Sequence, residues 1–237
     1  MKPQFLFRAG WRVFFWAAGL RAALSMLGWV FWLALSGAGM DAGQLGLTMP
    51  PQMWHAHEMI FGYATAALGG FFLTAVPNWT GAKAAPERFI ALVFALWLAG
   101  RIAVCLSGIL PAWLVAVVDL AFLPVLGAKV LTQLMARPKP QNMMFLLLLS
   151  LVWVSNLMVH LQWMGLPGTE RQGLRGGLLT ISAMIAVLGG RVTPAFTRNA
   201  LVRDGHEDAL PVIRKPLESA GVVLPLATAI AVLIGLP

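Results

Sequence analysis

The sequence predicts an all-α fold, a polytopic bundle of membrane-spanning helices. The 237 residues are 59% hydrophobic and 11% charged, whereas soluble domains carry roughly 25% charged residues. Apolar runs of about 20 residues follow one another, and each is long enough to cross a hydrocarbon core of about 30 Å as a helix. The only cysteine, Cys105, excludes a disulfide within the chain. We therefore expect one integral membrane domain, residues 1–237, in contact with lipid.

The apolar runs predict about seven spans. They cover residues 17–36, 54–76, 89–106, 112–134, 143–164, 176–188 and 218–236. Residues 1–16 precede the first run and mix basic with aromatic side chains, which favour the headgroup region, so we expect an interfacial lead-in. Arg21, inside the first span, is expected to extend its head outward to water.

Proline and glycine mark the ends of the later spans. Residues 77–78 (Pro-Asn) are expected to end the second span. A tight turn over residues 107–111 separates the third from the fourth, and residues 137–140 (Arg-Pro-Lys-Pro) close the fourth. Residues 189–191 (Gly-Gly-Arg) are expected to end the sixth span and to open a polar loop to Lys215, with Arg191 as an anchor.

Lysine and arginine give the predicted orientation. They concentrate in the N-terminal segment and in the second, fourth and sixth loops, and the positive-inside rule then places the N-terminus in the cytoplasm. This distribution also explains the net charge of +8 without a nucleic-acid partner. The same topology brings His55, His57 and His160 to the outer level of the bundle.

These three histidines are the candidate metal ligands, since imidazole binds transition metals and haem iron. Helical residues two apart point about 200° away from each other. Either His55 precedes its helix, or His55 and His57 serve different partners. Met53 lies beside them with Met40, and thioethers suit Cu(I). The alternative is that these side chains pack at the headgroup level and bind nothing.

Polar residues within the spans supply further candidates. Trp153, Asn156 and His160 lie on one helical stripe, so Asn156 is a candidate to orient His160; the alternative is a helix–helix hydrogen bond. The second span has a row of small residues on the stripe that carries Glu58. We expect this row to pack against another helix, with its face toward the bundle interior.

Arg101 and Asp119 are charged residues inside the third and fourth spans. The tight turn makes these helices antiparallel neighbours, and each charge lies roughly 10 Å from the outer end. We expect a mutual ion pair, and the alternative is that Arg101 binds a haem propionate.

Two stretches resemble signatures of the NnrS family. The first is Trp54-His55-Ala56-His57-Glu58-Met59-Ile60-Phe61-Gly62-Tyr63 with residues 72–81, and the second is residues 189–199. The resemblance implies a bacterial inner-membrane protein with haem and copper, linked to nitric oxide metabolism and nitrosative-stress resistance. It also implies about twelve spans, of which this chain matches the first half. The chain is then a fragment, the product of an early stop, or a half-length protein whose partner supplies the other spans. Because His55 and His57 lie in the family motif, the resemblance implies that they are cofactor ligands. His160 is expected to be a ligand because it lies at the same depth in the membrane.

Two other functions compete with a metal-binding role. One is a transporter or metal-permease half in which Asp119, Arg101 and Asn156 line a polar pathway. The other is a non-catalytic packing subunit. The sequence has no nucleophile–base pair or phosphate-binding glycine loop on the cytoplasmic side, so it assigns no reaction.

Overall fold

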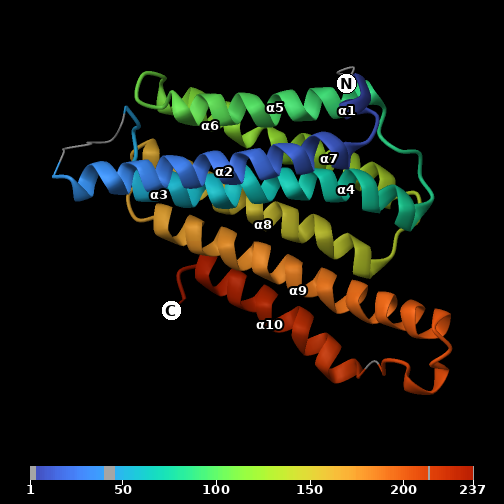
Figure 1. Ribbon diagram of the computed structural model, residues 1–237. Coiled ribbons are helices and arrows are strands. Elements are labelled where there is room, and N and C mark those ends of the chain that lie inside the picture. The colour runs from blue at the N-terminus through green and yellow to red at the C-terminus, as the bar shows by residue number, and fades with distance from the viewer. Residues whose placement is uncertain (1–3, 40–45, 213, 237) are drawn as a thin grey trace.

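The computed structural model describes residues 4–39, 46–212 and 214–236. The described chain is helical, and seven of its helices are long and apolar enough to cross a membrane (Figure 1). They are Gly10–Gly37, Pro51–Thr80, Glu87–Cys105, Ala112–Leu134, Pro140–Trp163, Glu170–Arg203 and Lys215–Leu233. The predicted polytopic helical fold is confirmed. Where the membrane boundaries fall along these helices, and which end faces outward, stay predictions.

The labels of Figure 1 divide these helices at local irregularities. The elements are α1 (Gln4–Phe7), α2 (Gly10–Gly37), α3 (Pro51–His57), η1 (Glu58–Ala64), α4 (Thr65–Thr80), α5 (Glu87–Cys105), α6 (Ala112–Leu120), α7 (Phe122–Leu134), α8 (Pro140–Trp163), α9 (Glu170–Arg203), η2 (Glu207–Ala209) and α10 (Lys215–Leu233). The segment η1 is a π-helix that continues α3 into α4.

Three predicted helix ends were wrong. The α2 helix begins at Gly10 and so includes residues 10–16 of the expected lead-in. Pro77 lies inside α4, which continues to Thr80 and is capped by Gly81 in the left-handed conformation (φ 70°). The α9 helix continues through residues 189–191 and Pro194 to Arg203. Glycine and proline cost a helix roughly 1 and 3 kcal/mol, and packing of α9 along α8 and α10 offsets that cost.

The small residues of the second span pack closely, as expected. Gly69 and Gly70 lie directly against the rings of Phe14 and Phe15 on α2. The helices α2, α4, α5, α7 and α8 run side by side, and α9 with α10 forms a hairpin along one side of this group (Figure 1). The buried apolar side chains form one large cluster between them. This packing holds α3, α6 and α8 with their polar residues facing one another.

Candidate metal centre

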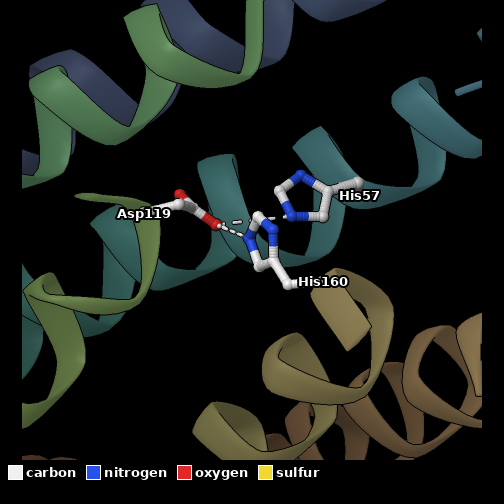
Figure 2. A group of neighbouring side chains, drawn as sticks. All are labelled: His57, Asp119 and His160. Carbon is white, nitrogen blue, oxygen red and sulfur yellow. Dashed lines mark hydrogen bonds and ion pairs between the residues drawn. The ribbon is translucent and has the colours of Figure 1, made fainter. Parts of the chain in front are cut away.

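Three buried side chains from three helices converge at one point of the bundle. His57 ends α3, Asp119 lies on α6 and His160 lies near the end of α8 (Figure 2). One ligand atom from each lies within 4.8 Å of the other two. His57 and His160 are fully buried, and Asp119 is 4% exposed. The predicted convergence of imidazoles from the second and fifth spans is confirmed for His57.

Asp119 connects the two histidines. Its Oδ2 atom lies 2.8 Å from His160 Nε2 and 3.5 Å from His57 Nε2. The two imidazole rings meet edge to face, with their centroids 5.6 Å apart. Figure 2 shows both Nε2 atoms turned toward the same carboxylate oxygen. Two imidazoles and one carboxylate with their donor atoms this close are the ligand types of many mononuclear metal sites.

The π-helix η1 begins directly after His57. Its first residue, Glu58, is fully buried and lies beside the His57 ring, with Oε1 3.1 Å from Nδ1. A π-helix leaves some backbone groups without their usual α-helical partners. Here Trp97 of α5 donates its indole N–H to the Gly62 carbonyl oxygen over 2.9 Å. Short π-helical segments occur frequently at functional sites, and this one directs two successive polar side chains inward.

His57 faces an oxygen acceptor at each ring nitrogen. Besides the Nδ1 contact to Glu58, Nε2 lies 2.9 Å from Asn156 Oδ1. Asn156 is oriented by its amide nitrogen, which donates to Asp119 Oδ2 over 2.8 Å. A neutral imidazole has a single N–H, so one of its nitrogens presents a lone pair to oxygen. A cation bound at Nε2, or a second proton on the ring, removes that opposition. Asn156 was expected to orient His160, and it contacts His57 and Asp119 instead.

Four charged side chains form a network beside this group. Arg101 donates to Glu58 Oε1 over 2.8 Å and pairs with Asp119 Oδ1. Arg21 of α2 pairs with Glu58 Oε2. The expected Arg101–Asp119 ion pair is confirmed. The expected outward extension of Arg21 was wrong, because a buried carboxylate without a countercharge costs several kcal/mol and Glu58 has two arginine partners.

Sequence reasoning missed Trp163, the last residue of α8. Its ring centroid lies 5.0 Å from that of His57 and 4.9 Å from that of His160. Its indole N–H donates to Glu170 Oε1 at the start of α9 over 2.9 Å. Trp163 therefore covers both imidazoles at this end of the bundle. The available signal was its position three residues after His160 on the same helix.

The structure separates His55 from the other histidines. His55 is helical like His57, and its ring stacks on Trp29 with centroids 5.1 Å apart. Its Nδ1 has no hydrogen-bond partner among the described residues. The alternative that His55 precedes its helix is therefore wrong, and the two rings contact different residues. Met53 packs against the hydrophobic clusters, and Met40 lies outside the described residues.

Arg191 belongs to the opposite end of the bundle. It donates to the Gln141 carbonyl oxygen over 2.6 Å, at the start of α8, and its guanidinium group lies over the Phe145 ring. At 1.5 Å per residue, Gln141 and His160 are about 28 Å apart along α8. Arg191 therefore joins α9 to α8 and has no contact with the metal-ligand group.

The sequence profile described as NnrS protein matches residues 5–237. The chain belongs to the NnrS family. No curated protein and no solved structure is detectably similar to it. With the seven apolar helices, this membership makes the chain a multi-pass membrane protein of a family named for nitric oxide-related function.

The residues of this NnrS chain fit a metal ion better than a haem. With the His57 Nδ1–H directed to Glu58, Nε2 carries the lone pair that binds a metal, and the carboxylate holds the ring as outer carboxylates do in metalloproteins. A porphyrin placed between His57 and His160 would have to displace Asp119, Trp163 and Phe61, whose ring centroid lies 5.2 Å from that of His57. A haem does not fit at this histidine pair.

Proposed function

We propose that this NnrS protein binds a copper ion through His57, Asp119 and His160, and that it acts in nitric oxide metabolism or nitrosative-stress resistance. The observation that carries the proposal is the position of two Nε2 atoms and one carboxylate oxygen around a single point. Divalent copper binds N and O ligands more strongly than the other divalent first-row metals, zinc included. The resemblance that implied copper therefore agrees with the donor set.

The protein's own residues have separate roles in this proposal. His57, His160 and Asp119 bind the ion, and Glu58 holds the His57 tautomer that leaves Nε2 unprotonated. Asn156 donates to Asp119 Oδ2 and so fixes the orientation of that carboxylate. Arg101 and Arg21 balance the two carboxylates, and Trp163 excludes water from the rings. When bound, copper supplies a coordination position for a small ligand such as nitric oxide.

We further propose that the protein resides in the bacterial inner membrane with its N-terminus in the cytoplasm, as the distribution of lysine and arginine predicts. Haem binding by this chain remains an expectation from the resemblance. His55 is the histidine left for it, since its Nδ1 has no partner among the described residues. A partner that supplies further spans also remains an expectation.

The transporter alternative receives less support. Asp119, Arg101 and Asn156 were expected to line a polar pathway, and instead they contact one another. Asp119 accepts from both other side chains, and the three are at most 5% exposed. A closed network of this kind holds side chains in place.

The test is metal analysis of the protein purified from membranes, with an optical spectrum and electron paramagnetic resonance. We expect about one copper per chain, lost in His57→Ala and in His160→Ala. His55→Ala is the matched control, because it makes the same substitution two residues away in the same helix, and it should retain copper. A wild-type protein without copper, or a His57→Ala protein with full copper content, would refute the site.

A further inference from the structure

Two cavities lie at the end of the bundle opposite the metal-ligand group, and Arg191 and Glu218 line both of them. The larger has a volume of about 670 Å³ and is lined by α4, α8, α9 and α10. The smaller has a volume of about 440 Å³ and lies between α9 and α10 (Figure 1). The metal-ligand group makes no use of the stretch 189–199. The residues of this stretch that line one or both cavities are Gly190, Arg191, Val192, Pro194, Ala195 and Phe196.

The depth of Arg191 corresponds to a layer of lipid headgroups. The α9 helix begins at Glu170, at the end of the bundle that holds Trp163. From Glu170 to Arg191 it rises about 32 Å at 1.5 Å per residue. The hydrocarbon core of a bilayer is about 30 Å thick. A helix that enters the bilayer near Glu170 therefore brings Arg191 to the phosphates of the opposite leaflet.

Arg191 presents hydrogen-bond donors to the two cavities. A guanidinium group carries five N–H donors, and Arg191 uses Nη2 for the Gln141 carbonyl oxygen. Among the described residues, the buried nitrogens without a partner include none of Arg191. The N–H groups that Gln141 leaves unused are therefore exposed, on a residue that lines both cavities. Guanidinium binds the oxygens of a phosphate through two parallel hydrogen bonds.

The charges around the cavities select an anion. Lys139 lines the larger cavity, Arg214 lines the smaller, and Arg191 lines both, against the single carboxylate of Glu218. Three positive and one negative side chain leave a net charge of +2. Among the described residues, none of these cations pairs with a carboxylate within 4.0 Å. A ligand with net negative charge lowers this excess, whereas a zwitterion leaves it unchanged.

The remaining lining fits an amphiphile with a hydroxyl group. Leu217 and Phe196, which line the smaller and the larger cavity, are 66% and 68% exposed, so acyl chains can continue from the cavities into the bilayer. Pro194 has no N–H and cannot donate to the carbonyl oxygen of Gly190, four residues earlier. Both residues line the smaller cavity. That carbonyl oxygen is an acceptor for a hydroxyl of the ligand.

We propose that these cavities bind an anionic phospholipid with a hydroxyl-bearing headgroup, the chemistry of phosphatidylglycerol. The phosphate accepts hydrogen bonds from Arg191, with Lys139 and Arg214 contributing from the two cavities. A headgroup hydroxyl donates to the Gly190 carbonyl oxygen, and the acyl chains lie against α9 and α10. The start of α8 is about 28 Å from His160, so the proposal does not depend on the metal.

The test is native mass spectrometry of the protein released from nanodiscs of equimolar phosphatidylglycerol and phosphatidylethanolamine with identical acyl chains. We expect bound phosphatidylglycerol to exceed bound phosphatidylethanolamine about tenfold or more. Gly190→Leu fills the smaller cavity without changing its charge, and it should lower that ratio about fivefold. Gly189→Leu is the matched control. An added Cβ meets open space at both glycines, but Gly189 lines neither cavity.

A second pair of variants tests the charge. Arg191→Gln should lower the ratio about fivefold, because each basic residue near the membrane surface favours an anionic lipid by about that factor. Arg203→Gln makes the same change of charge on the same helix and lines neither cavity. It lies about 18 Å further along α9, beyond a Debye length of about 10 Å. The ratio should therefore stay at the wild-type value.

Copper content and melting temperature, measured on the same preparations, separate this test from that of the metal centre. All four variants should keep wild-type copper, since none of the substituted residues contacts a proposed ligand. A ratio near one in the wild type overturns the proposal, and so does a ratio that Gly190→Leu and Arg191→Gln both leave unchanged. Displacement of phosphatidylglycerol by inorganic phosphate also overturns it, because the cavities would then bind a small soluble anion.

Discussion

An arginine–aspartate ion pair occurs both in the bundle interior and in the α9–α10 hairpin, but the first pair is buried and the second is exposed to solvent. Arg101 is 5% exposed and contacts two carboxylates. Arg203, at the end of α9, pairs with Asp204, and these side chains are 78% and 61% exposed. An exposed ion pair contributes about 0–1 kcal/mol, whereas removing one partner of a buried pair costs about 3–5 kcal/mol. An arginine–aspartate pair is therefore needed for stability in the interior, whereas the pair in the hairpin can be replaced with little change in stability.

Burial of the helices differs in the same sense. In the most apolar 18-residue stretch of Pro51–Thr80, half of the residues are buried inside the structure. In the corresponding stretch of Lys215–Leu233 only 6% are buried. Side chains that contact several helices are held in one orientation, as a metal site requires. We therefore expect substitutions in the interior to change both copper binding and stability, and substitutions of exposed side chains in the hairpin to change neither.

The largest effect is expected for Asp119→Asn. The change removes a proposed ligand and leaves Arg101 with one fewer carboxylate, so copper should be lost and stability should fall by about 3–5 kcal/mol. Copper analysis and thermal unfolding in detergent measure the two effects. Asp204→Asn is the control in the hairpin, and it should change stability by about 0.5 kcal/mol or less. Equal effects of both substitutions would contradict the comparison.

Glu58→Gln should have the next largest effect. An amide in place of the carboxylate weakens the hold on His57 Nδ1–H and unbalances Arg21 and Arg101. Loss of an outer partner of a metal-binding histidine typically lowers metal affinity about 10–100-fold. Competition with a copper chelator measures the affinity. Glu218→Gln, on the exposed start of α10, is the matched control, and a similar loss there would show that the effect is not local.

Trp163→Phe should have a smaller effect. It keeps a smaller aromatic ring against His57 and His160 and removes the hydrogen bond to Glu170. Such bonds within membranes contribute on average about 0.6 kcal/mol. We expect copper content to remain and copper release to a chelator to become faster. Release at the wild-type rate would show that Trp163 does not limit access to the site.

The smallest effect is expected for Arg191→Gln. It removes a contact between α9 and α8 about 28 Å from His160, so copper content and affinity should match the wild type. Arg101→Gln is the paired substitution in the interior, and it should lower both affinity and melting temperature. Loss of copper in Arg191→Gln would contradict the difference between the two regions, because the two ends of α8 would then be coupled.

Particular residues show how far sequence reasoning reached. Hydrophobic run lengths predicted the seven helices, and the short turn between the third and fourth predicted the Arg101–Asp119 pair. The convergence of His57 and His160 at one end of the bundle was also predicted, from a topology based on loop charges. The prediction that Arg21 extends to water was wrong because each buried charge was considered without its neighbours. Counting Glu58 and Asp119 against Arg101 would have revealed that the interior needed a second positive side chain.

The sequence by itself determined the membrane-spanning helices, because burying backbone in lipid requires continuous apolar helices whatever their neighbours are. It also predicted that His57 and His160 lie near the same end of the bundle, since each is close to the corresponding end of its span. The tertiary structure alone decided that His57 rather than His55 meets His160, and that Trp163 covers them. Those choices depend on how each helix is rotated about its axis and on the π-helix at Glu58, which packing against other helices sets and a linear pattern does not encode.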